Sequence, residues 1–200
     1  AKLRIKVYPS SSDISGGSAV GLFRYCDFFN FLGPSITVYG LLPGGTHMKS
    51  DELYGTTIHE LGHAMHYKLN KTIYSSIQTR IHESIANGVE FYLVPIKYPT
   101  YSFYTKSIDR YTEIMKDLMD ESKTVVCYSY YNHTLDSTIS YYPPLSYYDD
   151  INCEYTCNNL IDASTGCSSP QEWFNSVYAL HIYPGEELYT SFNFWFDLRY

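Results

Sequence analysis

The sequence predicts an α+β fold, in which a small N-terminal sheet is followed by two central helices and a mainly helical C-terminal half. Three observations support this prediction. Short segments with the alternating or β-branched character of strands occur before residue 43. Two stretches between residues 50 and 92 carry apolar residues at helical spacing. Further helical patterns, interrupted by prolines, come after them, so strands and helices are segregated along the chain.

Two N-terminal segments are predicted to be strands. Residues 3–8 alternate apolar and basic side chains, and the side expected to be buried consists of Leu3, Ile5 and Val7. Residues 36–42 form the second strand, which a Pro-Gly-Gly sequence ends. We expect this second strand, from residue 35 onward, to lie at the sheet edge, where an extended peptide could add through main-chain hydrogen bonds. The aromatic segment between the two, residues 23–32, fits either a strand or a short helix.

A helix is predicted over residues 50–69. Ser50 and Asp51 are candidates for its N-cap, and Asn70 is the expected stop. Three apolar residues at positions i, i+3 and i+7 form its buried stripe, namely Ile58, Leu61 and Met65. That stripe is offset from a second face that carries two histidines.

The two histidines belong to the sequence His59-Glu60-Leu61-Gly62-His63, which contains the His-Glu-x-x-His motif of many zinc metallopeptidases. On a helix His59 and His63 are one turn apart on the same face, so both imidazoles can bind one metal ion. Glu60 directly follows the first histidine and can accept a proton from a bound water. His66 lies about 10 Å along the helix axis from His59 and is interpreted as a bystander.

A second helical stretch offers a third metal ligand. Its apolar stripe is formed by Ile77, Ile81, Ile85 and Val89. Glu83, Asn87 and Glu90 lie together on another face of this helix. A catalytic zinc site usually has three protein ligands and one open position, and Glu83 comes twenty residues after His63.

These motifs resemble the gluzincin metallopeptidases, of which thermolysin is the familiar example. The resemblance covers residues 50–92. It implies a zincin-like fold in which the N-terminal sheet backs the active-site helix and a mainly helical C-terminal lobe closes the cleft. It also implies one catalytic Zn²⁺. It assigns the role of metal ligand to His59, His63 and Glu83, and the role of general base to Glu60. The same stretch also resembles bacterial zincin-like cell-envelope proteins.

The resemblance further assigns Asn87 to the residue that supports the first histidine. In gluzincins an acid four residues after the glutamate ligand accepts the second ring N–H of that histidine. Here the position holds Asn87, whose amide oxygen can accept the same hydrogen bond but brings no negative charge.

The function implied by the resemblance is a zinc-dependent peptidase that acts on a peptide or protein substrate. Gluzincins usually add a His or Tyr that helps to hold the oxyanion, and the candidates are His133, Tyr141, Tyr142 and His181. One alternative is a catalytically weak or inactive zinc-bearing scaffold that binds extracellular protein or glycan through a surface rich in tyrosine. A second alternative is a structural protein in which the two histidines hold no metal.

Charge and hydropathy limit the classes of partner. Two hundred residues suit a single domain, with one lobe over residues 1–96 and another over residues 97–200. A net charge of −7 without a basic run argues against a nucleic-acid partner. No apolar run approaches the roughly 20 residues of a transmembrane helix, so no integral membrane segment is predicted in this chain. The predicted location is extracellular or in the cell envelope, after removal of a signal or anchor.

The five cysteines leave three interpretations open. In an exported protein, Cys26, Cys127, Cys153, Cys157 and Cys167 suggest one or two disulfides and a spare thiol. A structural zinc site could instead use the last three with Cys127 or His133. In a cytosolic protein all five would be free thiols.

The C-terminal half is predicted to be mainly helical. Helices are expected over residues 107–121, over residues 172–180 with Pro170 in the first turn, and over residues 185–198. Residues 124–131 are β-branched and aromatic and fit a strand.

Overall fold

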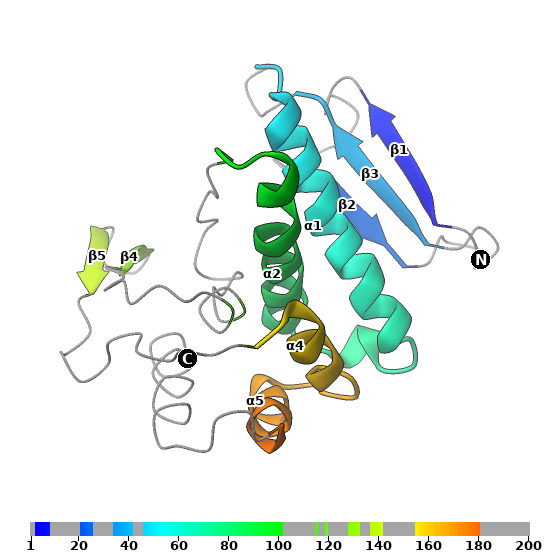
Figure 1. Ribbon diagram of the computed structural model, residues 1–200, viewed down its shortest axis with the longest axis vertical. Coiled ribbons are helices and arrows are strands. Elements are labelled where there is room, and N and C mark those ends of the chain that lie inside the picture. Colours follow the sequence, from blue (N-terminus) through cyan, green and yellow to red (C-terminus); the bar gives the residue numbers. More distant parts are fainter. Residues whose placement is uncertain are drawn as a thin grey trace. The chain divides into compact units, whose positions relative to one another are not determined.

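The computed structural model describes residues 3–8, 21–25, 34–41, 46–101, 115, 119, 128–132, 137–141 and 155–180. These residues form a mixed α+β structure, as the sequence predicts (Figure 1). Its elements are β1 (Arg4–Tyr8), β2 (Gly21–Arg24), β3 (Ser35–Tyr39), α1 (Ser50–Leu69), a 3₁₀ turn (Tyr74–Ser76), α2 (Thr79–Lys97), β4 (Tyr128–Asn132), β5 (Ser137–Tyr141), α4 (Cys157–Ala163) and α5 (Pro170–Ala179).

The chain divides into two compact units. One comprises Ala1–Ser75 and Ile85–Phe103, and the other comprises Ser76–Ser84 and Tyr104–Tyr200. The boundary between them falls inside the unbroken helix α2. The division into lobes at residues 96 and 97 stays a prediction.

The first unit contains a three-stranded sheet of order β1-β3-β2, in which β3 runs parallel to β1 and antiparallel to β2. Ile36 pairs with Ile5 on one side and with Phe23 on the other. The prediction that the second strand lies at the sheet edge is therefore wrong. All five residues of β3 are buried, and its main chain is hydrogen-bonded on both sides, so among the described strands β1 and β2 are the edges.

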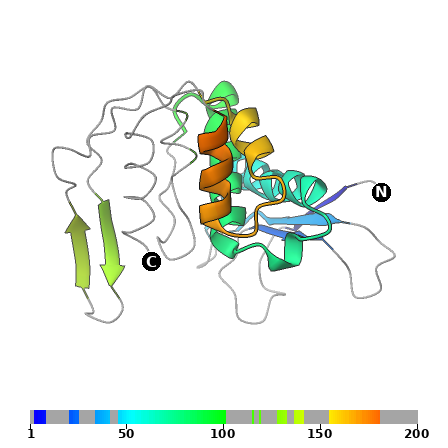
Figure 2. The same cartoon turned by 90° about the horizontal axis from the view of Figure 1, so that it is seen from below.

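The predicted burial of one side of β1 is also wrong. Ile5 is 51% exposed and Val7 is 64% exposed. The reason lies in the next layer, because the helix that covers the sheet, α1, packs mainly against β2 and β3 rather than against the edge strand β1 (Figure 2). Alternation predicts which residues share a face of a strand, but the covering helix decides whether that face is buried.

Helix α1 begins at Ser50 and ends at Leu69, as predicted. Its N-cap is Lys49 rather than Ser50 or Asp51, and the Lys49 N–H donates to Glu52 Oε2 at 2.8 Å. The acids of the first turn suit the positive end of the helix. Asn70 ends the helix by donating its N–H to the His66 carbonyl at 3.0 Å, which confirms the predicted stop.

Helices α1 and α2 run antiparallel and very close together (Figure 1). A β-carbon added at Gly62 would lie 2.7 Å from Ala86 Cα, so only glycine permits this approach. The predicted apolar stripe of the second helix is confirmed, since Ile81, Ile85 and Val89 are almost fully buried. Helix α2 continues through Pro95 to Lys97.

The second unit contains the antiparallel pair β4–β5 and the contacting helices α4 and α5. Helix α5 starts at Pro170, as predicted, and Ser169 Oγ caps it by accepting the Glu172 N–H at 3.3 Å. Trp173 Nε1 donates to the Leu160 carbonyl at 3.0 Å and ties α5 to α4. Strand β4 overlaps the predicted strand at residues 124–131. The helix predicted at 185–198 lies outside the described residues, as does the one at 107–121 apart from the helical Met115 and Met119.

Candidate metal centre

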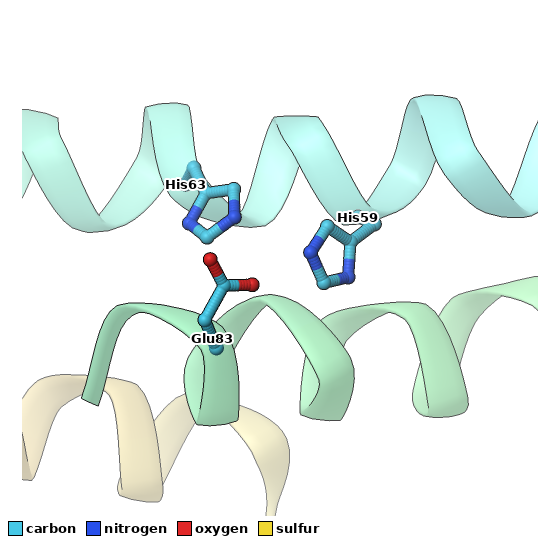
Figure 3. Close-up of side chains that lie close together, drawn as sticks. All are labelled: His59, His63 and Glu83. Atoms are coloured by element: carbon cyan, nitrogen blue, oxygen red, sulfur yellow. The ribbon is translucent and has the colours of Figure 1, made fainter. Parts of the chain in front are cut away.

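The two motif histidines and one glutamate lie together between α1 and α2. His59, His63 and Glu83 each offer a ligand atom, and these atoms all lie within 4.8 Å of one another. Figure 3 shows the three side chains pointing toward one another, the histidines from α1 and the glutamate from α2. Both histidines are buried and Glu83 is half-buried. The structure thus brings the three predicted ligands into one group.

The close approach of the helices explains how side chains so far apart in sequence meet. Gly62 faces Ala86 across the helix pair, so His63 on the next position of α1 lies opposite the first half of α2. Glu83 stands three residues before Ala86, about one turn away. The helix pair therefore brings Glu83 within reach of both imidazoles.

The donor set fits a zinc ion. Two imidazoles and one carboxylate are a common ligand set for catalytic zinc, and they leave one position open. Zinc bond lengths place tetrahedral ligand atoms about 3.3 Å apart, and the three candidate atoms all lie within 4.8 Å of one another, which is compatible with a shared ion. The same ligands also suit other divalent transition metals, which makes zinc the preferred rather than the exclusive ion on this geometry.

His59 is held by Glu90, not by Asn87. Its Nδ1 lies 3.1 Å from Glu90 Oε2, and both side chains are buried. Because this contact engages Nδ1, Nε2 is the ring nitrogen of His59 that could bind a metal. Within the described part of the chain, Asn87 Oδ1 is buried and accepts no hydrogen bond. The predicted role of Asn87 is therefore corrected, and a carboxylate supplies the negative charge that the amide lacks.

The register of the helices explains the correction. Because Gly62 faces Ala86 and the helices are antiparallel, His59 is level with residue 89. Side chains lean toward the N-terminus of their own helix, which carries the long Glu90 side chain back to the level of His59. The sequence contained a signal for this partner. Asn87 and Glu90 follow Glu83 on the same helix face, and of these two only Glu90 is an acid.

A tyrosine holds the far side of the Glu90 carboxylate. Tyr101 Oη donates to Glu90 Oε1 at 2.8 Å. Burial, reinforced by the neighbouring Glu90 charge, raises the pKa of Tyr101 far above its ordinary value, so this phenol stays a hydrogen-bond donor. Sequence reasoning missed Tyr101, because nothing in its local pattern distinguishes it among 23 tyrosines.

Glu60 is buried where α1 meets strand β2. A β-carbon added at Gly21 would lie 2.6 Å from Glu60 Oε1, so the carboxylate rests against the main chain of this strand. Among the described strands β2 is an edge of the sheet, so the candidate general base lies against an edge strand.

His66 and the candidates for holding the oxyanion are the remaining predicted site residues. His66 is buried with its ring against Tyr74, at a centroid distance of 5.7 Å, and it is not a member of the metal-ligating group. Tyr141 lies on β5, whose side chains are not described, and the other oxyanion candidates, His133, Tyr142 and His181, lie outside the described residues.

Two of the cysteines are free thiols. Cys157 and Cys167 are buried and form no disulfide, so a bridge through either of them is contradicted. Burial raises the pKa of the Cys157 thiol to about 11 and raises that of Cys167 as well. Cys26, Cys127 and Cys153 lie outside the described residues, and a disulfide among them stays a prediction.

Comparison of the chain with protein-family models, with curated proteins and with solved structures gives no match. Of the helices that the structure describes, none is both long enough and apolar enough to cross a membrane.

Proposed function

We propose that this protein is a zinc-dependent peptidase of the gluzincin type, with a zincin-like fold. One observation carries the proposal: His59 and His63 on α1, and Glu83 twenty residues further along the chain on α2, each offer a ligand atom, and these atoms all lie within 4.8 Å of one another. The spacing of the motif suggested these residues, and their convergence supports the suggestion. The Glu90 carboxylate behind His59 adds support, since ligand histidines typically donate their second N–H to such a group.

Each residue has a defined role in the proposed reaction. When bound by His59, His63 and Glu83, zinc lowers the pKa of a water toward about 7 and polarises a substrate carbonyl. Glu60 accepts the proton of the attacking water and later donates it to the leaving amine. Glu90 keeps the proton of His59 on Nδ1, so that Nε2 remains a ligand.

Strand β2 is the proposed binding edge for an extended substrate. It contacts α1, its Gly21 lies against Glu60, and among the described strands it pairs with β3 alone. A peptide added to its open edge would bring its own carbonyl groups alongside the general base. The close contact at Gly21 is what permits this arrangement, because any larger residue there would meet Glu60.

A substitution at Glu60 tests the catalytic role. Glu60→Gln should retain zinc and lose hydrolysis of a peptide library by about 10²-fold or more, since proton transfer is lost while the three ligands remain. Library cleavage is followed by mass spectrometry, and zinc content is measured on the same samples. Cleavage at the parental rate would remove Glu60 from the role of base.

The same measurements of library cleavage and zinc content distinguish the proposed peptidase from the alternative, a zinc-bearing binding module. An amide at position 87 in place of an acid would favour such a weak or inactive scaffold, but the Glu90 carboxylate supplies a negative charge beside His59. A wild-type protein that holds zinc and cleaves no member of a broad peptide library would favour the binding module. The resemblance to cell-envelope proteins supports a location outside the cytoplasm for either function.

A further inference from the structure

We propose that Tyr101 is a positioning residue of the metal centre, which acts through Glu90 to hold the His59 ring. The inference rests on the proposed metal site and adds to it a residue that the sequence motif does not contain. Three side chains form a continuous chain of contacts: Tyr101 Oη to Glu90 Oε1 at 2.8 Å, and Glu90 Oε2 to His59 Nδ1 at 3.1 Å.

Glu90 uses both of its carboxylate oxygens. One oxygen accepts from the phenol and the other faces the imidazole. Glu90 is 2% exposed, so no bulk solvent competes for either oxygen. With both oxygens engaged, the carboxylate has a fixed plane, and the ring that it contacts has a fixed orientation.

The fold leaves space for the Tyr101 phenol at Gly55. A β-carbon added at Gly55 would overlap Tyr101 Oη, and it would lie 2.7 Å from Cζ and 3.2 Å from Glu90 Oε1. Gly55 lies in the second turn of α1, and inside a helix glycine costs roughly 0.5–1 kcal/mol relative to alanine. A glycine at this place therefore suits the contact with Tyr101 rather than the stability of the helix.

Tyr101 lies four residues after Lys97, the last residue of α2. It follows the end of α2 through a turn in which its own N–H donates to the Tyr98 carbonyl at 2.9 Å. This turn directs the ring back toward α1, between Gly55 and Glu90. The end of α2 thus reaches the metal centre through a side chain that binds no metal.

The test compares Tyr101→Phe with Tyr98→Phe, which removes a hydroxyl three residues earlier from a ring that contacts Tyr54 at a centroid distance of 5.4 Å. Zinc affinity is measured by competition with a chelator. We expect Tyr101→Phe to weaken zinc binding about 3- to 10-fold, less than the 10- to 100-fold typical of a direct partner of a ligand. Tyr98→Phe should stay within about 2-fold of wild type on the same scale.

Two further variants distinguish action through Glu90 from a general loosening of the fold. In a Glu90→Ala background, Tyr101→Phe should have no further effect on zinc affinity, because the path to His59 is already broken. Gly55→Ala should weaken zinc binding in the same direction as Tyr101→Phe, because its methyl group displaces the phenol. An effect of Tyr101→Phe that is as large without Glu90 as with it would overturn the proposal.

A second readout needs no metal. In ¹⁵N-labelled metal-free protein at pH 8, the His59 Nδ1 proton should give a downfield signal held by Glu90, assigned by its loss in His59→Asn. Tyr101→Phe should shift this signal upfield or broaden it, and Tyr98→Phe should leave it in place. An unchanged signal and unchanged zinc affinity in Tyr101→Phe would overturn the role of Tyr101 alone. Failure of the wild type to bind zinc would overturn the metal centre and, with it, any positioning role in that centre.

Discussion

At the scale of single residues, the support of His59 is the point at which this chain departs from the gluzincin pattern. Glu90→Ala should weaken zinc binding about 10- to 100-fold, since the ligand ring loses its hydrogen-bond partner. Asn87→Ala, a truncation on the same helix face, should change zinc affinity by no more than about 3-fold, because its Oδ1 accepts no hydrogen bond within the described residues. Chelator competition on both variants measures the difference. Equal losses of zinc affinity in the two variants would indicate that Asn87 supports His59 as much as Glu90 does.

The buried thiol of Cys157 offers a second test at this scale. Burial raises its pKa to about 11, so almost none of it is thiolate at pH 8. In the folded protein its alkylation, followed by peptide-mapping mass spectrometry, should be slow at pH 8 and should accelerate as the pH rises toward 11. The raised pKa also means that the unfolded chain ionises first, so this thiol's contribution to stability is lost as the pH rises above the unfolded value. Rapid alkylation at pH 8 would contradict the burial of Cys157.

At the scale of elements, the contact between α1 and α2 brings together the ligands of the proposed metal centre. Alanine normally stabilises a helix relative to glycine, yet Gly62→Ala should destabilise this protein by about 1–3 kcal/mol, because its methyl group meets the main chain of Ala86. The same change should lower zinc affinity by moving Glu83 away from the histidines. Thermal unfolding of the metal-free protein and chelator competition measure the two effects. A Gly62→Ala variant that is more stable than wild type would contradict the close helix contact.

The sequence predicted single elements better than the contacts between them. The bounds of α1 and the buried stripe of α2 follow from local periodicity and an Asn stop, and both are confirmed. Two predictions were wrong, the edge position of β3 and the burial of one side of β1. Both depend on which strands pair and on where α1 packs, and a local sequence pattern contains neither piece of information. The partner of His59 was missed for the same reason, because it depends on the register between two helices.

At the scale of the whole molecule, zinc should act as a folding ligand. A metal held by side chains from both helices binds the native state and stabilises it, by about 2.7 kcal/mol at a free zinc concentration of 100 times Kd. The melting temperature should therefore rise with zinc and fall on addition of a chelator. His63→Ala should lose this response, whereas His47→Ala, which changes an exposed histidine before α1, should keep it. A zinc response that is equal in both variants would place the metal elsewhere.

Metal content is the measurement that tests the central claim most directly. Wild type and Glu83→Ala are loaded with zinc, dialysed and analysed for bound metal. The proposed three-ligand centre predicts about one zinc per chain in wild type and a large loss in Glu83→Ala, because that variant keeps only two ligands. Full retention of zinc by Glu83→Ala would contradict the assignment of Glu83, and the absence of zinc from wild type would contradict the metal centre itself.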